Sequence, residues 1–286
     1  MKYFIIVKNK KLIIIIIFLI TNMNIDICEV ITKYIYKPSY KLLDWININN
    51  LDWNYLSKNP NAIELLRANP DKINWYYLSS NPNAIEILKE NLDKIDWYEL
   101  SGNPNAIEIL KKHPNKINWY GLSKNPNAIE ILKENQDKID WNNLSANPNA
   151  IEILKQYPNK INKYGLSKNP NAIELLKENQ DKIDWNNLSA NPNAIELLKT
   201  NPDKIDWNNL SLNPNAIEIL KEHPEKIKWN IMSSNPNAIE TLKKNQDKIS
   251  WRELSQNFQI FILDDNEIIK ENIQKILEII LYKSKK

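Results

Sequence analysis

The sequence has very little glycine, cysteine or histidine: three, one and two residues among 286. The single cysteine, Cys28, excludes an intramolecular disulfide framework, and isolated glycines cannot form a phosphate-binding loop. His113 and His223 share one position of the repeat described below, which predicts helix-end residues rather than ligands or bases. We therefore expect no enzymatic activity, no metal site and no cofactor. The glycines stand at variable positions that we expect at the surface: Gly102, Gly121 and Gly165.

A basic stripe is also absent. The net charge of +3 hides an uneven distribution, because the first 50 residues are basic whereas residues 51–255 carry 26 basic and 27 acidic side chains. Binding of nucleic acid through its phosphates requires a cluster of positive charge. We therefore do not expect nucleic acid as a partner.

The N-terminal segment, residues 1–30, differs from the rest of the chain. Residues 1–11 are basic and residues 12–20 form an apolar run that is too short to span a bilayer. One interpretation is a signal or anchor, although no Ala-x-Ala-like cleavage site follows, and it predicts a secretory or membrane route. The other is an extension upstream of a true start at Met23. We expect membrane contact only if residues 1–22 act as a signal or anchor.

The dominant feature of the chain is a 22-residue repeat. The motif Asn-Pro-Asn-Ala-Ile recurs nine times, and every step between copies is 22 residues. A fixed period of this length is the signature of a repeat architecture. The motif begins at Asn59, Asn81, Asn103, Asn125, Asn147, Asn169, Asn191, Asn213 and Asn235.

Each unit predicts two helices. Asn81 is a cap residue and Pro82 suits the first helical position, so a first helix is expected to begin there. The Ala-Ile-x-Ile-Leu run that follows gives it one apolar face. A second, shorter helix is expected to begin after the cap residue Asp96, with Trp97 and Leu100 on one face. Neither helix is stable alone at this length, so neighbouring units must supply the burial.

The predicted fold class is therefore all-α: a solenoid of nine short helix pairs over residues 53–250. Degenerate capping repeats are expected at both ends, over residues 31–52 and 251–286, the second ending in an amphipathic helix and a basic tail. The alternative is a leucine-rich repeat, which needs an apolar residue five positions before the motif asparagine. That position holds residues such as Tyr76 and Asn142. The strand pattern fails, and the helical solenoid is favoured.

A column is the set of equivalent positions in successive repeats, and two columns have both a packing and a binding interpretation. Tryptophan fills nine of the ten equivalent positions from Trp53 to Trp251, and Lys163 interrupts the row. Because lysine replaces it once, the row is expected to be half-buried packing, with a ligand-stacking ladder as the alternative. The asparagines of the Asn83 column either form a ladder that links neighbouring units or present a polar strip for binding. The Glu-x-x-Lys spacing and a further lysine row predict a solvated, charge-paired face.

Variation is concentrated in two columns that flank the second helix. Variable residues on a constant scaffold are how repeat proteins build binding surfaces. Recent duplication also explains constancy elsewhere, since residues 120–154 and 164–198 differ at only two positions. The candidate binding edge consists of Tyr55, Lys58, Tyr77, Ser80, Glu99, Gly102, Lys124, Asn143, Ala146, Lys168, Asn187, Asn209, Leu212 and Ile231.

The unit Trp-x-x-Leu-Ser-x-Asn-Pro-Asn-Ala-Ile, over about residues 45–257, resembles the uncharacterised 22-residue tandem-repeat proteins of giant DNA viruses of amoebae. The resemblance implies a viral origin and a repeat scaffold, with no catalytic residues to carry over. If translation starts at Met23, a viral origin predicts the host cytoplasm or the virion as the location. We expect a non-enzymatic scaffold that mediates protein–protein interaction with a host or viral protein. The alternatives are a structural, virion-associated protein without a specific partner and a ligand binder that uses the tryptophan row.

Overall fold

The computed structural model describes residues 40–264. Residues Leu42–Phe261 form one compact unit that contains all the repeats. Two short strands, β1 (Tyr40–Leu42) and β2 (Phe261–Leu263), pair where the chain enters and leaves this unit. The N-terminal segment, residues 1–30, and the predicted amphipathic helix after residue 264 lie outside the described residues.

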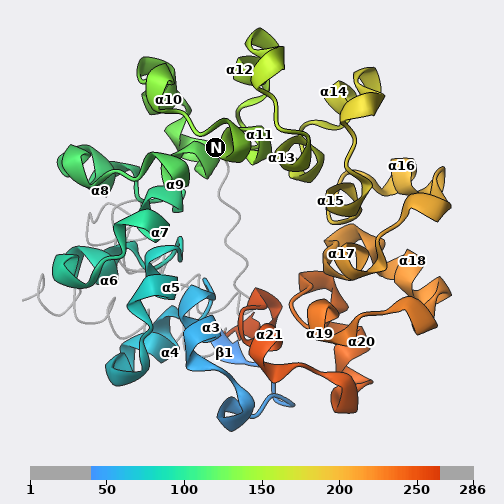
Figure 1. Ribbon diagram of the computed structural model, residues 1–286. Helices are drawn as coiled ribbons and strands as arrows, with labels where there is room; N and C mark the ends of the chain where they lie inside the picture. The colour runs from blue at the N-terminus through green and yellow to red at the C-terminus, as the bar shows by residue number, and fades with distance from the viewer. Residues whose placement is uncertain (1–39, 265–286) are drawn as a thin grey trace, which may run out of the picture. The chain divides into compact units, whose positions relative to one another are not determined.

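Each repeat contributes an inner and an outer helix to a ring (Figure 1). The inner helices are α3 (Trp53–Lys58), α5 (Trp75–Ser79), α7 (Trp97–Gly102), α9 (Trp119–Lys124), α11 (Trp141–Ala146), α13 (Lys163–Lys168), α15 (Trp185–Ser189), α17 (Trp207–Leu212), α19 (Trp229–Met232) and α21 (Trp251–Ser255). The outer helices are α4 (Ile63–Arg67), α6 (Ile85–Glu90), α8 (Ile107–Lys112), α10 (Ile129–Glu134), α12 (Ile151–Gln156), α14 (Ile173–Glu178), α16 (Ile195–Lys199), α18 (Ile217–Glu222) and α20 (Ile239–Lys243).

Short 3₁₀ turns connect these helices. One set lies between an outer helix and the next inner helix: η3 (Pro70–Lys72), η4 (Leu92–Lys94), η5 (Pro114–Lys116), η7 (Gln136–Lys138), η8 (Pro158–Lys160), η9 (Gln180–Lys182), η10 (Pro202–Lys204), η12 (Pro224–Lys226) and η14 (Gln246–Lys248), with η2 (Ile48–Asn50) in the same place before α3. The others lie at the repeat motif: η6 (Pro126–Ala128), η11 (Pro214–Ala216), η13 (Pro236–Ala238) and η15 (Phe258–Ile260).

The predicted all-α solenoid is confirmed. Every described repeat is helical, which excludes the leucine-rich alternative. The predicted caps of the inner helices are also present, as in α7, where the Asp96 carboxylate accepts the Glu99 N–H at 2.9 Å. The inner helix is shorter than the outer one in only two of the nine repeats, those with α5 and α19, whereas α7 and α8, for example, both have six residues.

The outer α-helix begins three residues later than predicted, although in three repeats a 3₁₀ turn begins at the motif proline and leads directly into it: η6, η11 and η13. Helix α6 begins at Ile85, and Ala84 before it has φ −88° and ψ 5°, which is not helical. The motif forms a tight turn instead, because the Ala84 N–H donates to the Asn81 carbonyl at 3.2 Å. The Asn81 side chain accepts the Asn83 N–H at 3.0 Å, so it caps this turn rather than the α-helix.

The core contains polar as well as apolar columns. Leucines of the inner and outer helices, such as Leu144 and Leu154, are fully buried, as is the motif alanine. The serine that follows the inner leucine and the first asparagine of the motif are equally buried in the repeats, for example Ser145 and Asn147. The capping role predicted for this asparagine did not include its burial.

Buried asparagines join consecutive repeats. The Asn147 Nδ2 donates to the Ser123 carbonyl at 3.0 Å and to the Asn125 carbonyl at 2.9 Å in the preceding repeat. Its Oδ1 accepts the Asn149 N–H at 3.0 Å within its own repeat. The amide therefore satisfies backbone groups that would otherwise be buried without partners.

Two further columns complete the contact between repeats. The Ser123 hydroxyl donates to the Trp119 carbonyl at 2.7 Å and accepts the Asp140 N–H of the next repeat at 3.0 Å. The Asn149 Nδ2 donates to the Pro126 carbonyl at 2.9 Å. The Asn83 column, which contains Asn149, is therefore a ladder between repeats.

The same bonds join the last repeat to the first. The Asp52 N–H donates to the Ser255 hydroxyl at 2.8 Å. The Asn59 Nδ2 donates to the Ser255 and Asn257 carbonyls at 3.0 and 3.1 Å. The Asn61 Nδ2 donates to the Phe258 carbonyl at 3.0 Å. Each bond type found between neighbouring repeats recurs here, so residues 42–261 close into a ring.

This closure changes the role predicted for the ends of the repeat array. The sequence suggested an open stack whose terminal repeats cover exposed faces. Residues 42–52 and 251–261 instead belong to the same compact unit as the repeats. Because the closing contact satisfies the polar groups of both end faces, neither face needs a separate cap there.

The tryptophan row is half-buried, as predicted. A lysine of the following connection lies over five of the rings, for example Lys94 Nζ at 4.6 Å from the Trp75 ring centroid. Stacking of an ammonium group on an indole face stabilises such a site by about 0.5–1 kcal/mol. The lysine row predicted to be only solvated thus also covers indole rings. The other pairs are Lys72 with Trp53, Lys138 with Trp119, Lys204 with Trp185 and Lys248 with Trp229.

Three other tryptophans contact a second aromatic ring instead. His113 lies 5.2 Å from the Trp97 ring centroid, and His223 and Tyr157 take the same place at Trp207 and Trp141. The histidines end their outer helices, as predicted. Asparagine in this column bonds to its own helix, as in the 2.9 Å bond from Asn91 to the Ile87 carbonyl.

We expect Lys163→Trp to stabilise the protein by about 1 kcal/mol. The introduced indole would take the half-buried position that tryptophan fills in the other nine repeats. Lys182 stands where the covering lysine is found elsewhere, so both packing and stacking should be gained. Thermal unfolding should show a melting temperature a few degrees higher, with Lys163→Gln as the control. A lower melting temperature would contradict the packing role of this column.

Candidate functional site

The predicted binding edge lies on the inner helices. Of its fourteen residues, only Lys58, Lys168 and Leu212 are exposed, and the other eleven are half-buried. The column that contains Tyr55 and Tyr77 lies between adjacent inner helices, where these two rings are 5.6 Å apart. This column is therefore partly an interface between repeats, whereas the Lys58 column is the more open of the two.

The surface location predicted for the glycines is wrong for Gly121, which is buried. A β-carbon at Gly121 would lie 2.5 Å from the Tyr98 carbonyl oxygen and 3.1 Å from the Ser101 β-carbon. At Gly165 the Asn142 carbonyl oxygen would be 2.6 Å away. Glycine at these positions allows the inner helices to approach one another closely.

Gly121→Ala is expected to lower the free energy of unfolding by about 2 kcal/mol. The helix-propensity gain of about 1 kcal/mol is outweighed because the obstructing atom belongs to the backbone. Gly102→Ala is the matched control, since a β-carbon there would meet the flexible end of the Lys124 side chain. Urea unfolding should give a clear loss for the first variant and little change for the second. Equal stability of the two variants would rule out the close approach.

The most exposed column of the inner helices was missed as a candidate site. It directly follows the tryptophan row and was used only to exclude the leucine-rich fold. Tyr76, Tyr120 and Tyr164 are 47%, 48% and 52% exposed. The sequence did contain a signal, namely that the residue in this column varies among tyrosine, asparagine and arginine. The column consists of Asn54, Tyr76, Tyr98, Tyr120, Asn142, Tyr164, Asn186, Asn208, Asn230 and Arg252.

Tyrosines gather on four consecutive inner helices, α3, α5, α7 and α9. We call Tyr55, Tyr76, Tyr77, Tyr98 and Tyr120 the tyrosine arc. Their rings form two contacting groups: Tyr55, Tyr77 and Tyr76, with centroid distances of 5.6 and 5.3 Å, and Tyr98 with Tyr120, at 5.6 Å. Each group crosses a boundary between repeats.

A cation lies at each end of the tyrosine arc. The Arg252 guanidinium, which comes from the last repeat, is 4.8 Å from the Tyr55 ring centroid. At the other end the Lys124 ammonium is 5.4 Å from the Tyr98 ring centroid. Both are within the range of a cation–π interaction. Because Arg252 belongs to the last repeat, its contact with Tyr55 depends on closure of the ring.

The opposite part of the inner helices is rich in asparagine. Asn187 and Asn209 bond to the capping carboxylates of their own helices at 2.8 and 3.0 Å. Asn143 has no partner for its buried Nδ2 atom, although its N–H donates to Asp140. The columns that contain Tyr76 and Tyr77 thus carry tyrosine on one side of the ring and mostly asparagine on the other.

Hydrogen bonding within the arc affects tyrosine ionisation. The Glu99 carboxylate accepts a hydrogen bond from the Tyr76 hydroxyl, and this raises the pKa of Tyr76 to about 12. Partial burial raises the pKa of Tyr98, and neighbouring Tyr120 and Glu99 add to the effect. Tyr76 and Tyr98 are therefore neutral at physiological pH, and their hydroxyls can donate hydrogen bonds.

The Tyr76 hydroxyl should titrate near pH 12, and Glu99→Gln should return its pKa towards 10.0 because the carboxylate is then lost. Between pH 10 and pH 12 an unfolded tyrosine ionises while folded Tyr76 stays neutral, so stability falls as the pH rises through this window. NMR of ¹³C-labelled tyrosine rings would measure the pKa, with Tyr76→Phe to assign the signal. An unchanged pKa in Glu99→Gln would contradict the bond.

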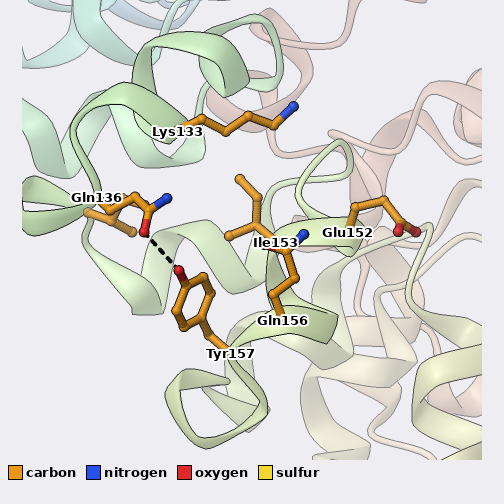
Figure 2. A pocket seen from close by; sticks show the side chains of 7 residues that line it. Lys133, Gln136, Glu152, Ile153, Gln156 and Tyr157 are labelled. Carbon is orange, nitrogen blue, oxygen red and sulfur yellow. Dashed lines mark hydrogen bonds between the residues drawn. The ribbon is translucent and has the colours of Figure 1, made fainter.

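The outer helices offer a weaker candidate. A cavity of about 270 Å³ lies between α10 and α12 (Figure 2). The Tyr157 hydroxyl donates to Gln136 at its edge at 2.8 Å. Its charged lining residues, Lys133 and Glu152, each pair within their own helix at 2.8 and 3.2 Å. The cavity therefore presents little unpaired polarity to a ligand.

Seven predicted Glu–Lys pairs are present on the outer helices, with N–O distances from 2.8 to 3.3 Å. They are exposed, and each contributes a few tenths of a kcal/mol at most. Among residues 40–264, no three histidine, cysteine, aspartate or glutamate side chains come together as metal ligands. No helix in the same range is long and apolar enough to cross a membrane.

Comparisons with known proteins give no relative for this chain: no family model, curated protein or solved structure matches it.

Proposed function

We propose that the ring is a non-enzymatic scaffold that binds a protein partner through the tyrosine arc. The observation that carries the proposal is the asymmetry of the inner helices, which place tyrosine on α3, α5, α7 and α9 where other repeats have mostly asparagine or glycine. Tyrosine is enriched in the centres of protein interfaces because it combines a rigid apolar ring with a hydroxyl donor. The resemblance to giant-virus repeat proteins suggests that the partner is viral or belongs to the host.

The tryptophan row is the less favourable binding surface. Eight of its rings are covered by a lysine or by a second aromatic side chain. A ligand would have to displace these side chains before it could stack on the indoles. The tyrosine arc contains exposed rings that need no such displacement, such as Tyr120.

The experiment compares two triple variants of the full chain as baits in amoebal lysate. Tyr76→Asn, Tyr98→Asn and Tyr120→Asn together remove the arc but install the residue that α11, α15 and α17 carry in the same column. The control changes exposed outer residues: Glu108→Gln, Glu130→Gln and Glu152→Gln. Quantitative mass spectrometry should find proteins that the wild type and the control retain and the arc variant loses by at least tenfold.

Equal recovery of the same proteins by the wild type, the arc variant and the control variant would contradict the proposal. It would favour the alternative of a structural, virion-associated protein without a specific partner. Circular dichroism and urea unfolding of the arc variant exclude a folding defect as the cause of any loss.

A further inference from the structure

The contact between the last and the first repeat, between α21 and α3, differs from all others in one respect. Elsewhere the serine and the N–H that it accepts are 17 residues apart in the chain, as for Ser123 and Asp140. Across this contact, which we call the seam, Ser255 and Asp52 are 203 residues apart. The seam therefore has the same hydrogen bonds as the other contacts but no short covalent connection.

The missing connection changes the cost of separating two repeats. A connection of 17 residues keeps separated neighbours close together, so they recombine at a high effective concentration. Separated ends of the seam are restrained only through the whole length of the array. Opening there releases more conformational freedom than opening anywhere else in the ring, while the nine connected contacts remain intact.

The lengths of the hydrogen bonds do not distinguish the seam. The Asp52–Ser255 bond is 2.8 Å, against 2.9 to 3.0 Å for its equivalents. The bond from the Asn59 Nδ2 to the Asn257 carbonyl is 3.1 Å, against 2.7 to 2.9 Å for its equivalents. The missing covalent connection is therefore what sets the seam apart. The additional links across the seam are small: a bond of 2.9 Å from the Leu43 N–H to the Ile260 carbonyl and the three-residue strands β1 and β2. A two-stranded sheet of this size is marginal by itself.

We propose that the ring is a clasp that opens reversibly at the seam, between α21 and α3. Opening breaks the bonds of Asp52, Asn59 and Asn61 and separates Arg252 from Tyr55, so the tyrosine arc stays intact but loses the cation at its first ring. The newly exposed faces carry many backbone carbonyls and asparagine amides, so water can satisfy them in the open state. An open ring can be placed around an elongated partner from the side.

Amide hydrogen exchange in the native full-length protein tests the proposal with internal controls. The Asp52 N–H donates to the Ser255 hydroxyl, and the N–H groups of nine other residues make the same bond at the connected contacts. After correction for intrinsic rates, the Asp52 amide should exchange at least tenfold faster than the median of the other nine. Exchange within threefold of that median would overturn the proposal.

A matched pair of variants makes the test independent of end effects. Asn61→Ala removes an exposed bond across the seam, and Asn149→Ala removes the same bond at a connected contact. The first should speed exchange of the Asp52 amide about fivefold or more, whereas the second should change the Asp140 amide less than twofold. Equal responses at the two contacts, or no response at either, would overturn the proposal. Both amides are bonded to serine, so neither substitution removes its acceptor directly.

Discussion

Asn147→Asp is expected to lower the free energy of unfolding at pH 7 by about 4 kcal/mol. The substitution replaces two donated hydrogen bonds with a carboxylate that faces the Ser123 and Asn125 carbonyl oxygens. The carbonyl oxygens carry partial negative charge, so in this fully buried site they strongly disfavour the charged form of the introduced carboxyl group. Asn147→Ala should cost less, about 3 kcal/mol, because it leaves carbonyls without partners but introduces no charge.

The deficit of Asn147→Asp should depend on pH. Burial next to two carbonyl oxygens raises the pKa of the introduced carboxyl in the folded state, so the folded protein binds a proton that the unfolded chain has released. Stability relative to the wild type is therefore partly regained as the pH falls towards 4 and is lost as the pH rises. Urea unfolding at pH 4.5 and pH 7 would measure this. Asn149→Ala, at an exposed position, is the control and should cost less than about 1 kcal/mol. A pH-independent loss below that value for Asn147→Asp would contradict the ladder of buried asparagines.

Deletion of one whole repeat, residues 164–185, should lower stability by about 5 kcal/mol. The deletion keeps the register, and in an open stack it would remove one unit and little else. In a ring it also prevents the last repeat from reaching the first unless every remaining contact rotates. The four seam hydrogen bonds made by Asp52, Asn59 and Asn61 would be strained or lost.

Urea unfolding of the deletion variant measures the loss, and exchange of the Asp52 amide reports on the seam in the same protein. Loss of protection at Asp52 together with the large drop in stability would agree with a ring of fixed size. A drop of only about a tenth of the total, with Asp52 still protected, would mean that the number of repeats does not determine closure.

Much of the fold follows from the sequence because the period determines the unit. The inner helix is indicated by a cap such as Asp96 followed by Trp97 and Leu100, and the structure has it. The outer helix was placed three residues too early, because an asparagine followed by proline also begins a tight turn. Ring closure could not be predicted, since curvature is the sum of small rotations at ten contacts and no single residue encodes it.

The candidate site was predicted only in part. The variable positions lie on the inner helices, where the proposed tyrosine arc also lies, but Gly121 was wrongly placed at the surface because variability was taken to mean exposure. The tyrosine column was missed because residues such as Tyr98 and Asn142 were considered only as failed strand positions. The fully buried Asn147 column was missed because asparagine is usually exposed, and its burial depends on two carbonyls that only the folded neighbour supplies.

Closure of the ring is tested most directly by a distance across the seam. In a Cys28→Ser background, spin labels are attached to the pair Asn54→Cys and Arg252→Cys. The control pair, Asn186→Cys and Asn208→Cys, occupies the same column in two connected repeats. Pulsed electron paramagnetic resonance should give overlapping, short distance distributions for the two pairs. A seam distance several times longer than the control distance, with no population at the short distance, would contradict the ring.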